Sequence, residues 1–166
     1  MKPTLTILLI LISSFILRAQ NNWITFKADE RLSIKSPAKP QDDTRGNYLS
    51  FEADSSVIYS LGVIDLKEMG GDSTIIKQII KNPEFALKMR EFAMRSFKAV
   101  KMEDFTAGEW KGFTSYRSSG TDQQMKMYDM LMFFVDYKMY NLTTVRLPKI
   151  GNAKVEQFFT SADIKP

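Results

Sequence analysis

Apolar and polar residues alternate with a period of two along much of this chain, a pattern typical of half-buried β-strands. In the first half, the alternation predicts strands at residues 23–26, 32–35, 49–53 and 57–66. The last two are joined by Asp54-Ser55 and are expected to form a hairpin. Prolines at positions 37 and 40 end the second strand, so residues 37–43 are expected to form a loop.

The middle of the chain changes to helical spacing. Asp72 or Ser73 can cap a short helix that carries four isoleucines between positions 75 and 80. A second helix is expected to start at Asn82-Pro83, because asparagine is a good N-cap and proline fits the first helical turn. The residues of this second helix that are expected to face the core are Phe85, Met89, Phe92, Ala93, Ser96, Phe97 and Val100.

The second half returns to strands, predicted at residues 101–106, 110–118, 123–135 and 137–147. Turns are expected at residues 107–109 and 120–122 and near Asp136. A final amphipathic helix from about Asn152 to Ser161 would turn its apolar residues Val155, Phe158 and Phe159 inward. The pattern therefore predicts one α+β domain over residues 20–166, with an antiparallel meandering sheet flanked by helices.

Residues 1–19 have the order of a secretory signal peptide: Lys2, an apolar run over residues 5–17, and the small residue Ala19 at the expected cleavage point. As a helix, the apolar run would span roughly 20 Å, less than the hydrocarbon core of about 30 Å. We therefore expect an exported protein, periplasmic or secreted, with no stable membrane anchor after cleavage. Cleavage after Ala19 is preferred to cleavage after Gln20.

The chain contains neither histidine nor cysteine. This excludes Ser-His-Asp and Cys-His catalysis, standard zinc sites and disulfide bonds. Lys2 and Arg18 would leave with the signal peptide, which lowers the formal net charge of +4 by two. Basic residues between positions 77 and 101 are mixed with acidic ones. A near-neutral chain of this kind is not expected to bind nucleic acid.

The order of strands, helix, strands and helix resembles the Mog1/PsbP-like α/β/α sandwich family of small exported bacterial proteins. The features that carry the resemblance are Trp23 and Phe26, the stretch Leu-Ser-Ile-Lys-Ser-Pro-Ala-Lys-Pro at 32–40, and Phe-Phe-Thr-Ser-Ala-Asp-Ile at 158–164. Leu32 stands where members often have phenylalanine. Members mostly act as assembly factors, accessory subunits or binding adaptors, so the resemblance implies a non-catalytic role here. It implies no particular binding residues.

Two patterns suggest reactive or metal-binding side chains. Ser36 and Lys39 have the S-x-x-K spacing of serine enzymes that use a lysine base, but the prolines at 37 and 40 oppose the required helical turn. The methionines at positions 125, 127, 130 and 132 offer soft sulfur ligands for cuprous ion. In one regular strand these four side chains would divide between two faces and could not converge. Both patterns are therefore expected to be structural.

Acidic pairs occur at Asp42-Asp43 and Glu103-Asp104, without the ligand spacing of a calcium loop. Gly70-Gly71 before a helix could present amide groups to an anion, but Asp72 would repel it. We therefore predict no catalytic, cofactor-binding or metal-binding residues, and no cofactor.

A possible partner surface consists of Leu87, Met94 and Arg90. Leu87 and Met94 are expected on the outer side of the second helix, opposite Phe85 and Phe92. We thus predict a non-catalytic binding or accessory domain that contacts another envelope or extracellular protein. One alternative is a carrier of an apolar small molecule, suggested by the methionines and phenylalanines of residues 125–134. A third is a carboxylate-only hydrolase, which needs two carboxyl groups roughly 5–10 Å apart in a cleft.

Overall fold

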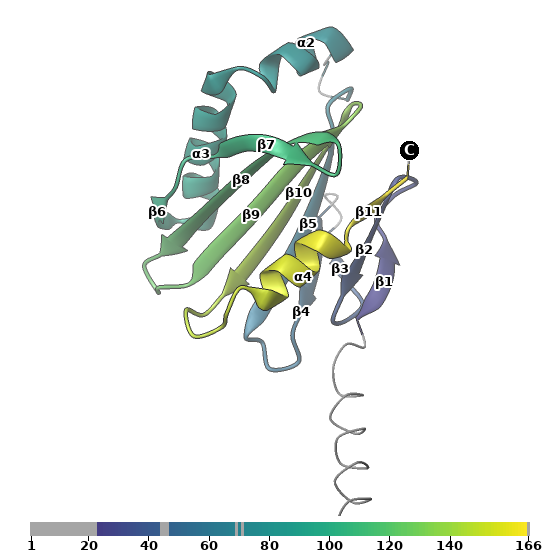
Figure 1. Ribbon diagram of the computed structural model, residues 1–166. Helices are drawn as coiled ribbons and strands as arrows, with labels where there is room; N and C mark the ends of the chain where they lie inside the picture. The colour runs from purple at the N-terminus through teal and green to yellow at the C-terminus, as the bar shows by residue number, and fades with distance from the viewer. Residues whose placement is uncertain (1–22, 44–46, 69, 71, 166) are drawn as a thin grey trace, which may run out of the picture.

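The computed structural model describes residues 23–43, 47–68, 70 and 72–165, shown in colour in Figure 1. The predicted signal peptide at residues 1–19 lies outside these ranges. Three short strands form a small antiparallel sheet in the order β1 (Ile24–Lys27), β2 (Leu32–Ser36) and β11 (Asp163–Ile164). The small sheet thus joins the first strands of the described chain to its last strand.

The remaining strands form one larger antiparallel sheet with the order β3-β4-β5-β10-β9-β8-β6, in which β7 also pairs with β8. Their bounds are β3 (Gln41–Asp42), β4 (Asn47–Phe51), β5 (Val57–Asp65), β6 (Ala99–Met102), β7 (Thr106–Trp110), β8 (Phe113–Asp122), β9 (Met127–Val135) and β10 (Lys138–Arg146). The predicted antiparallel, sheet-rich architecture is confirmed.

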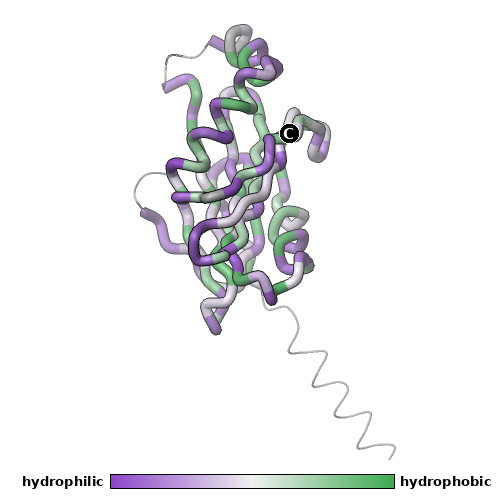
Figure 2. The backbone as a smooth tube through the Cα atoms, turned by 90° about the vertical axis from the view of Figure 1, so that its left-hand side faces the viewer, coloured by the Kyte–Doolittle hydropathy of each residue, from purple (hydrophilic) through white to green (hydrophobic). Residues whose placement is uncertain are grey.

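Strand β9 is buried on both faces of the large sheet. Leu131, Phe133 and Val135 belong to one core, while Met130, Met132 and Phe134 belong to the other. The first core lies under α4 (Ala153–Ser161) and the small sheet, and the second lies under α2 (Ser73–Ile79) and α3 (Pro83–Phe97). Figure 2 shows the large sheet edge-on, with α4 on its right and α2 at its upper end. No helix among the described residues is long and apolar enough to cross a membrane.

The prediction of a turn at residues 107–109 is wrong, because these residues lie inside β7. The hairpin turn is Lys111-Gly112, where both residues have positive φ angles of 50° and 85°. Two such residues suit the tight turns of twisted hairpins. The Lys111 ammonium group donates hydrogen bonds to the carbonyl oxygens of Thr160 (3.1 Å) and Ala162 (2.5 Å). The turn thereby anchors the C-terminal end of α4.

The next turn also lies later than predicted. Strand β8 continues through Asp122, and the chain reverses over residues 123–126. The Asp122 carboxylate accepts hydrogen bonds from the backbone N–H groups of Gln124 and Lys126. The reversal near Asp136 is confirmed, with Asp136 at a φ of 52° between β9 and β10.

The inward face of α3 differs from the predicted one. Ala93 is buried at its centre, but Phe92, which was expected in the core, is 60% exposed. Met94, which was expected outside, packs against the core between α3 and the sheet. Both flanks of the inward stripe are apolar, so the helical pattern alone could not fix the rotation of the helix. The small side chains of Ala86 and Ala93 face the sheet, which lets the helix backbone approach it.

An ionic cluster joins the β1–β2 turn to β10. The Asp29 carboxylate accepts hydrogen bonds from the backbone N–H of Leu32 (2.8 Å), the Lys138 ammonium (2.9 Å) and the Tyr140 hydroxyl (2.8 Å). Burial disfavours the ionised carboxylate, but these hydrogen bonds outweigh that effect and lower the pKa of Asp29. Burial and the neighbouring carboxylate raise the pKa of Tyr140. The cluster therefore fixes the small sheet against the large one.

Replacing Asp29 with asparagine should lower the free energy of unfolding by about 2 kcal/mol at pH 7, because the charge that accepts from Lys138 and Tyr140 is lost. The folded-state pKa of Asp29 is depressed, so its stabilisation is complete above the usual pKa of about 3.9 and is lost as the pH falls below it. Urea unfolding at pH 7 and pH 3 should show a smaller difference between wild type and Asp29→Asn at pH 3. Glu109→Gln, which alters an exposed carboxylate on β7, is the control. A pH-independent difference for Asp29→Asn would contradict the assignment.

Candidate functional site

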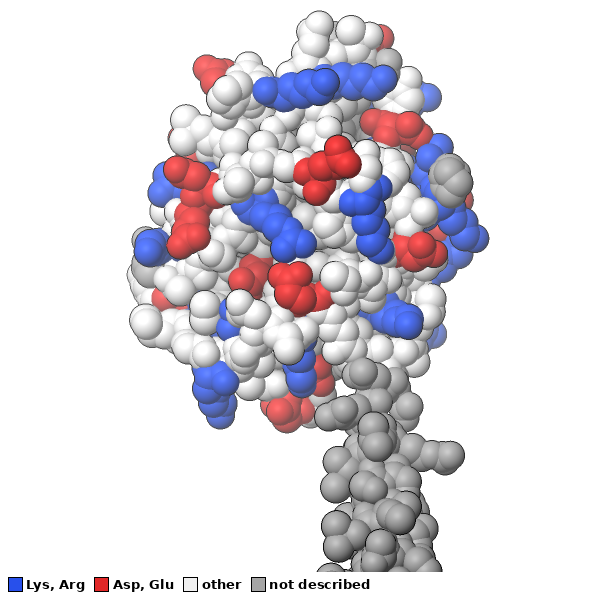
Figure 3. Space-filling view, viewed as in Figure 1, with Lys and Arg blue, Asp and Glu red and all other residues white. Residues whose placement is uncertain are grey.

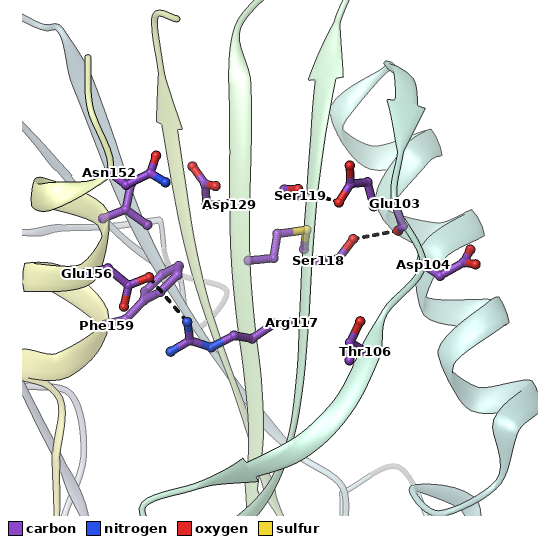
Figure 4. Close-up of a pocket in the computed structure, with 12 residues that line it drawn as sticks. Glu103, Asp104, Thr106, Arg117, Ser118, Ser119, Asp129, Asn152, Glu156 and Phe159 are labelled. Atoms are coloured by element: carbon purple, nitrogen blue, oxygen red, sulfur yellow. Dashed lines mark hydrogen bonds and ion pairs between the residues drawn. The ribbon is translucent and has the colours of Figure 1, made fainter.

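A polar groove of about 250 Å³ runs between α4 and the edge of the large sheet formed by β6, β7 and the segment that joins them (Figure 4). The edge segment crosses from one core to the other: Phe105 is buried in the core under α3, whereas Trp110 packs on Phe133 in the core under α4. This crossing leaves the groove open above β8 and β9. Its lining residues are Glu103, Asp104, Thr106, Arg117, Ser118, Ser119, Asp129, Met130, Asn152, Val155, Glu156 and Phe159.

Arg117 of β8 projects across the floor of the groove toward α4 (Figure 4). Its guanidinium donates to the Glu156 carboxylate at 3.3 Å and lies 5.7 Å from the centre of the Phe159 ring. On the opposite wall, Glu103 accepts from the Ser119 hydroxyl at 3.2 Å, and its backbone carbonyl accepts from the Ser118 hydroxyl at 2.7 Å. The groove therefore presents charges of both signs, each with a partner inside the protein.

Arg146 holds together the end of the groove where α4 begins. Its side chain is only 3% exposed, and its guanidinium contacts β9 and the loop between β10 and α4. It donates to the Asp129 carboxylate on β9 (3.0 Å), to the carbonyl of Ile150 in the loop (2.5 Å) and to the side-chain oxygen of Asn152 before α4 (2.6 Å). This arginine therefore positions both Asp129 and the start of α4.

The groove supplies the several carboxylates in one cleft that the hydrolase hypothesis requires. Two of them, Asp129 and Glu156, already form ion pairs with arginines. Asp104 lies 3.5 Å from Arg90 of α3. Among the described residues, no group of three or more histidine, cysteine, aspartate or glutamate side chains is arranged to hold a metal ion. The arrangement suits recognition of a polar group better than proton transfer, because its carboxylates are engaged by fixed donors.

Basic and acidic side chains are interspersed over the face that carries α4 and the groove (Figure 3). The ion pairs Lys138–Asp29 (2.9 Å), Arg31–Asp136 (2.7 Å) and Lys154–Glu52 (3.0 Å) account for part of this mixing. No single sign of charge dominates this face.

The reactive patterns predicted from the sequence fall into structural roles. Ser36 is buried, and its hydroxyl donates to the carbonyl of Ala38 at 2.6 Å, whereas Lys39 is exposed. Met127 contacts Arg146 on one face of β9, while Met130 and Met132 lie in the core on the other. Met125 precedes the strand and is exposed. Met127, Met130 and Met132 thus divide between the two faces as predicted, whereas Met125 lies in the turn before β9 and not in the strand.

The remaining acidic candidates are local caps and turns. Asp72 caps α2 by accepting from the backbone N–H of Thr74 at 2.7 Å. Asp43 accepts from the backbone and side-chain amides of Asn47. These carboxylates therefore stabilise the start of a helix and a turn.

The predicted partner surface on α3 is brought together only in part. Leu87 is 53% exposed, but Met94 is partly buried, and the Arg90 side chain donates to the carbonyl of Met102 in β6 at 2.9 Å. The three residues thus follow the border between α3 and the sheet edge, where Met94 and Arg90 are occupied by contacts within the chain. Their role in partner binding stays a prediction.

A larger apolar surface lies on the side of the large sheet that carries α3, beyond the strands that α3 covers. Strand register places five apolar side chains there, and none belongs to either core. We call this set the open sheet surface: Leu49, Phe51, Ile58, Ile64 and Val145. Phe51 and Ile64 are 37% and 39% exposed. The alternating pattern did not predict this site, although apolar residues on both faces of β5 were a visible signal.

An apolar pocket of about 190 Å³ lies between α2 and the end of the large sheet, and we call it the α2 pocket. Its lining residues are Leu66, Ile76, Ile79, Ile80, Phe85, Phe134 and Met139. Met139 pairs with Ile64 across β10 and β5, so the pocket adjoins the open sheet surface. The carrier hypothesis also requires an apolar cavity, and the α2 pocket is one.

Comparisons with known proteins identify no family for this chain. No protein-family model and no curated protein sequence matches the chain. A crystal structure from Bacteroides thetaiotaomicron VPI-5482 aligns with a TM-score of 0.48 and 8% sequence identity, over 81% of this chain and 45% of that one. The chain therefore spans less than half the length of that protein.

Replacing Arg146 with methionine should lower the free energy of unfolding by about 3–5 kcal/mol, because Asp129 would be left half-enclosed without its cation. Chemical denaturation measures the loss. Arg95→Met, on the exposed side of α3, is the matched control and should change stability by less than about 0.5 kcal/mol. The double variant Asp129→Asn/Arg146→Met should recover part of the loss. Equal stability of Arg146→Met and wild type would contradict this role.

Proposed function

We propose that this chain is an exported, non-catalytic binding or accessory domain of the Mog1/PsbP-like sandwich type, which holds another protein against its open sheet surface. The observation that carries the proposal is the unequal covering of the large sheet. On one face, α4 and the small sheet cover β5, β10 and β9. On the other, α2 and α3 pack over β8 and β9 and leave Phe51, Ile58 and Val145 outside the core.

The size and composition of this surface support a protein partner. Contiguous apolar residues on a monomer mark interaction sites, whereas single exposed ones are ordinary. Cross-strand register places Phe51, Ile58 and Val145 in one row over three adjacent strands. The next row consists of Leu49, Ser60 and the buried Thr143. An apolar row with polar neighbours is the composition of a protein interface, which combines an apolar centre with hydrogen-bonding groups.

The exposed ring of Phe92 extends this surface. It lies two turns along α3 from Phe85, on the same side of the helix, and Phe85 lines the α2 pocket. Leu87 lies on the other flank of α3, beside Asp104 and Phe105. The two flanks of α3 can therefore be tested separately.

The polar groove supports a weaker alternative. A ligand in it would have to compete with the Arg117–Glu156 and Arg146–Asp129 ion pairs, so part of its binding energy would be offset. The open sheet surface has no such internal partners to displace. Burial there gains hydrophobic free energy from the exposed parts of the apolar side chains, which are largest at Phe51 and Ile64.

Ile58→Lys should abolish retention of the partner when the mature chain is used for affinity capture from its own envelope fraction, because a charge would be buried in the interface. Leu87→Lys, an equally drastic change on the other flank of α3, should retain it. Quantitative mass spectrometry of the retained proteins measures both, after circular dichroism has shown that each variant is folded. Loss of the partner with Leu87→Lys but not with Ile58→Lys would refute the open sheet surface as the docking site. It would favour docking at the border formed by Leu87, Arg90 and Met94.

A further inference from the structure

Strand β7 forms an exposed edge of the large sheet. Among the described residues it pairs with β8 alone, so the backbone groups on its other side have no partner strand. Four of its five residues, Thr106 to Glu109, are exposed. An edge of this kind can accept a further strand, and proteins usually protect such edges with short strands, prolines, lysines or irregular pairing.

The other edge strands of the described chain carry such protection. Strands β3 and β11 contain two residues each, and Pro40 directly precedes β3. Strand β6 contains Lys101 and pairs irregularly with β8 between Ala99 and Lys101, and β1 ends at Lys27. Strand β7 is longer than β3 and β11, pairs regularly with β8 and contains neither proline nor lysine; its one charge is that of Glu109. It is therefore the edge most open to another strand.

The glycine at the centre of β7 is not required by the fold of one chain. A Cβ atom added at Gly108 would meet only the Ser115 hydroxyl oxygen, at 4.0 Å, which is ordinary contact. Gly108 is also not among the glycines with a positive φ angle. A glycine inside a strand weakens it and often marks a place where another backbone approaches closely. Gly108 therefore indicates a strand from outside the chain.

The alternation of hydrogen bonds identifies the residues that face the free edge. A two-residue turn joins β7 to β8, so the flanking residues Trp110 and Phe113 exchange hydrogen bonds. By alternation Gly108 also bonds to β8, whereas Ala107 and Glu109 direct their N–H and C=O groups away from it. The free edge of β7 thus offers the donors and acceptors of these two residues.

These two residues favour one symmetric register with a second copy of the chain. With Gly108 opposite Gly108 of the second copy, each Ala107 pairs with the Glu109 of the other copy, and each of these two pairs exchanges two hydrogen bonds. A register centred on Ala107 would leave Glu109 without a partner in β7. A register centred on Glu109 would place two carboxylates directly opposite each other, which is destabilising. In the favoured register the two Gly108 Cα atoms form the close, non-hydrogen-bonded type of pair, about 4.5 Å apart.

We propose that β7 is a dimerisation edge, at which two copies of this protein join their large sheets by antiparallel pairing of β7 with β7 about Gly108. The two-fold axis closes the assembly at two copies. Pairing of five-residue strands buries less than the roughly 1,200 Å² of stable complexes, so the dimer is weak. The open sheet surface lies on β4, β5 and β10, away from β7 in the strand order, and stays free in both copies. A dimer would thus present two such surfaces.

Cysteine crosslinking tests the register, because the chain contains no cysteine of its own. In Gly108→Cys the two Cα atoms would lie about 4.5 Å apart, within reach of a disulfide. In the matched control Glu109→Cys they would lie roughly 8 Å apart, beyond the limit of about 7 Å. Under mild oxidation, Gly108→Cys should therefore form a disulfide-linked dimer at least about tenfold faster, as measured by non-reducing electrophoresis. Equal or faster crosslinking of Glu109→Cys would overturn the register.

A proline at position 107 tests the edge itself. Ala107→Pro removes an N–H group that pairing with β8 does not use, so the chain should stay folded by circular dichroism and lose the dimer. Ala107→Ser keeps the N–H group and is the control. Sedimentation equilibrium of the mature chain from about 10 μM to 1 mM should show an average mass that rises toward twice the monomer for wild type and Ala107→Ser, and a monomer for Ala107→Pro. A wild type that stays monomeric over this range, or a dimer that survives Ala107→Pro, would overturn the proposal.

These measurements are independent of the function proposed above, because they need no other protein. Ile58→Lys, on the open sheet surface, should dimerise as wild type does. Loss of the dimer in Ile58→Lys would overturn β7 as the dimerisation edge and place the contact between copies on the open sheet surface.

Discussion

The two-sided burial of β9 is the constraint on which the rest of the structure depends. Six consecutive residues, Met130 to Val135, are almost fully enclosed, three on each face of the sheet. A strand of this kind is stable only if both faces of the sheet are covered above it. This requirement explains why the helix pair of α2 and α3 lies on one face and α4 on the other, although the two segments are separated in sequence by five strands and their turns.

The cover on the two faces is built differently, and the difference creates the candidate site. On the face of α4, the small sheet adds a second layer that extends over β5 and β10, fixed by the contacts of Asp29 with Lys138 and Tyr140. On the other face, α3 follows β8 and β9, and nothing equivalent to the small sheet belongs to the core there. Among the described residues, Ile58 and Val145 lie on that face outside the core and are only partly buried, so the surface follows from where the helices must lie to protect β9.

Local patterns predicted the elements well, but they did not predict how the elements pack. Strand β5 and helix α4 lie close to their predicted bounds because each has a clear period and, for α4, buried Val155, Phe158 and Phe159. The β7–β8 turn was misplaced because Lys111 adopts a conformation that glycine and asparagine favour, so Gly112 alone marked the turn in the sequence. The rotation of α3 depends on the distance between its backbone and the sheet, and the open sheet surface depends on register between strands distant in sequence. Neither quantity is encoded within a single window of residues.

The polar groove and the open sheet surface differ in what a ligand would gain at each. In the groove, Arg117 and Arg146 are engaged by Glu156 and Asp129, so the charges stabilise the fold before any ligand arrives. On the open sheet surface, Phe51 and Ile64 remain in contact with water, and only an external partner can bury them. Hydrophobic free energy that folding leaves unused is available to binding, whereas charge pairs already formed must be broken first. This asymmetry favours the apolar side of the sheet as the functional face, although the groove is the more conspicuous hollow.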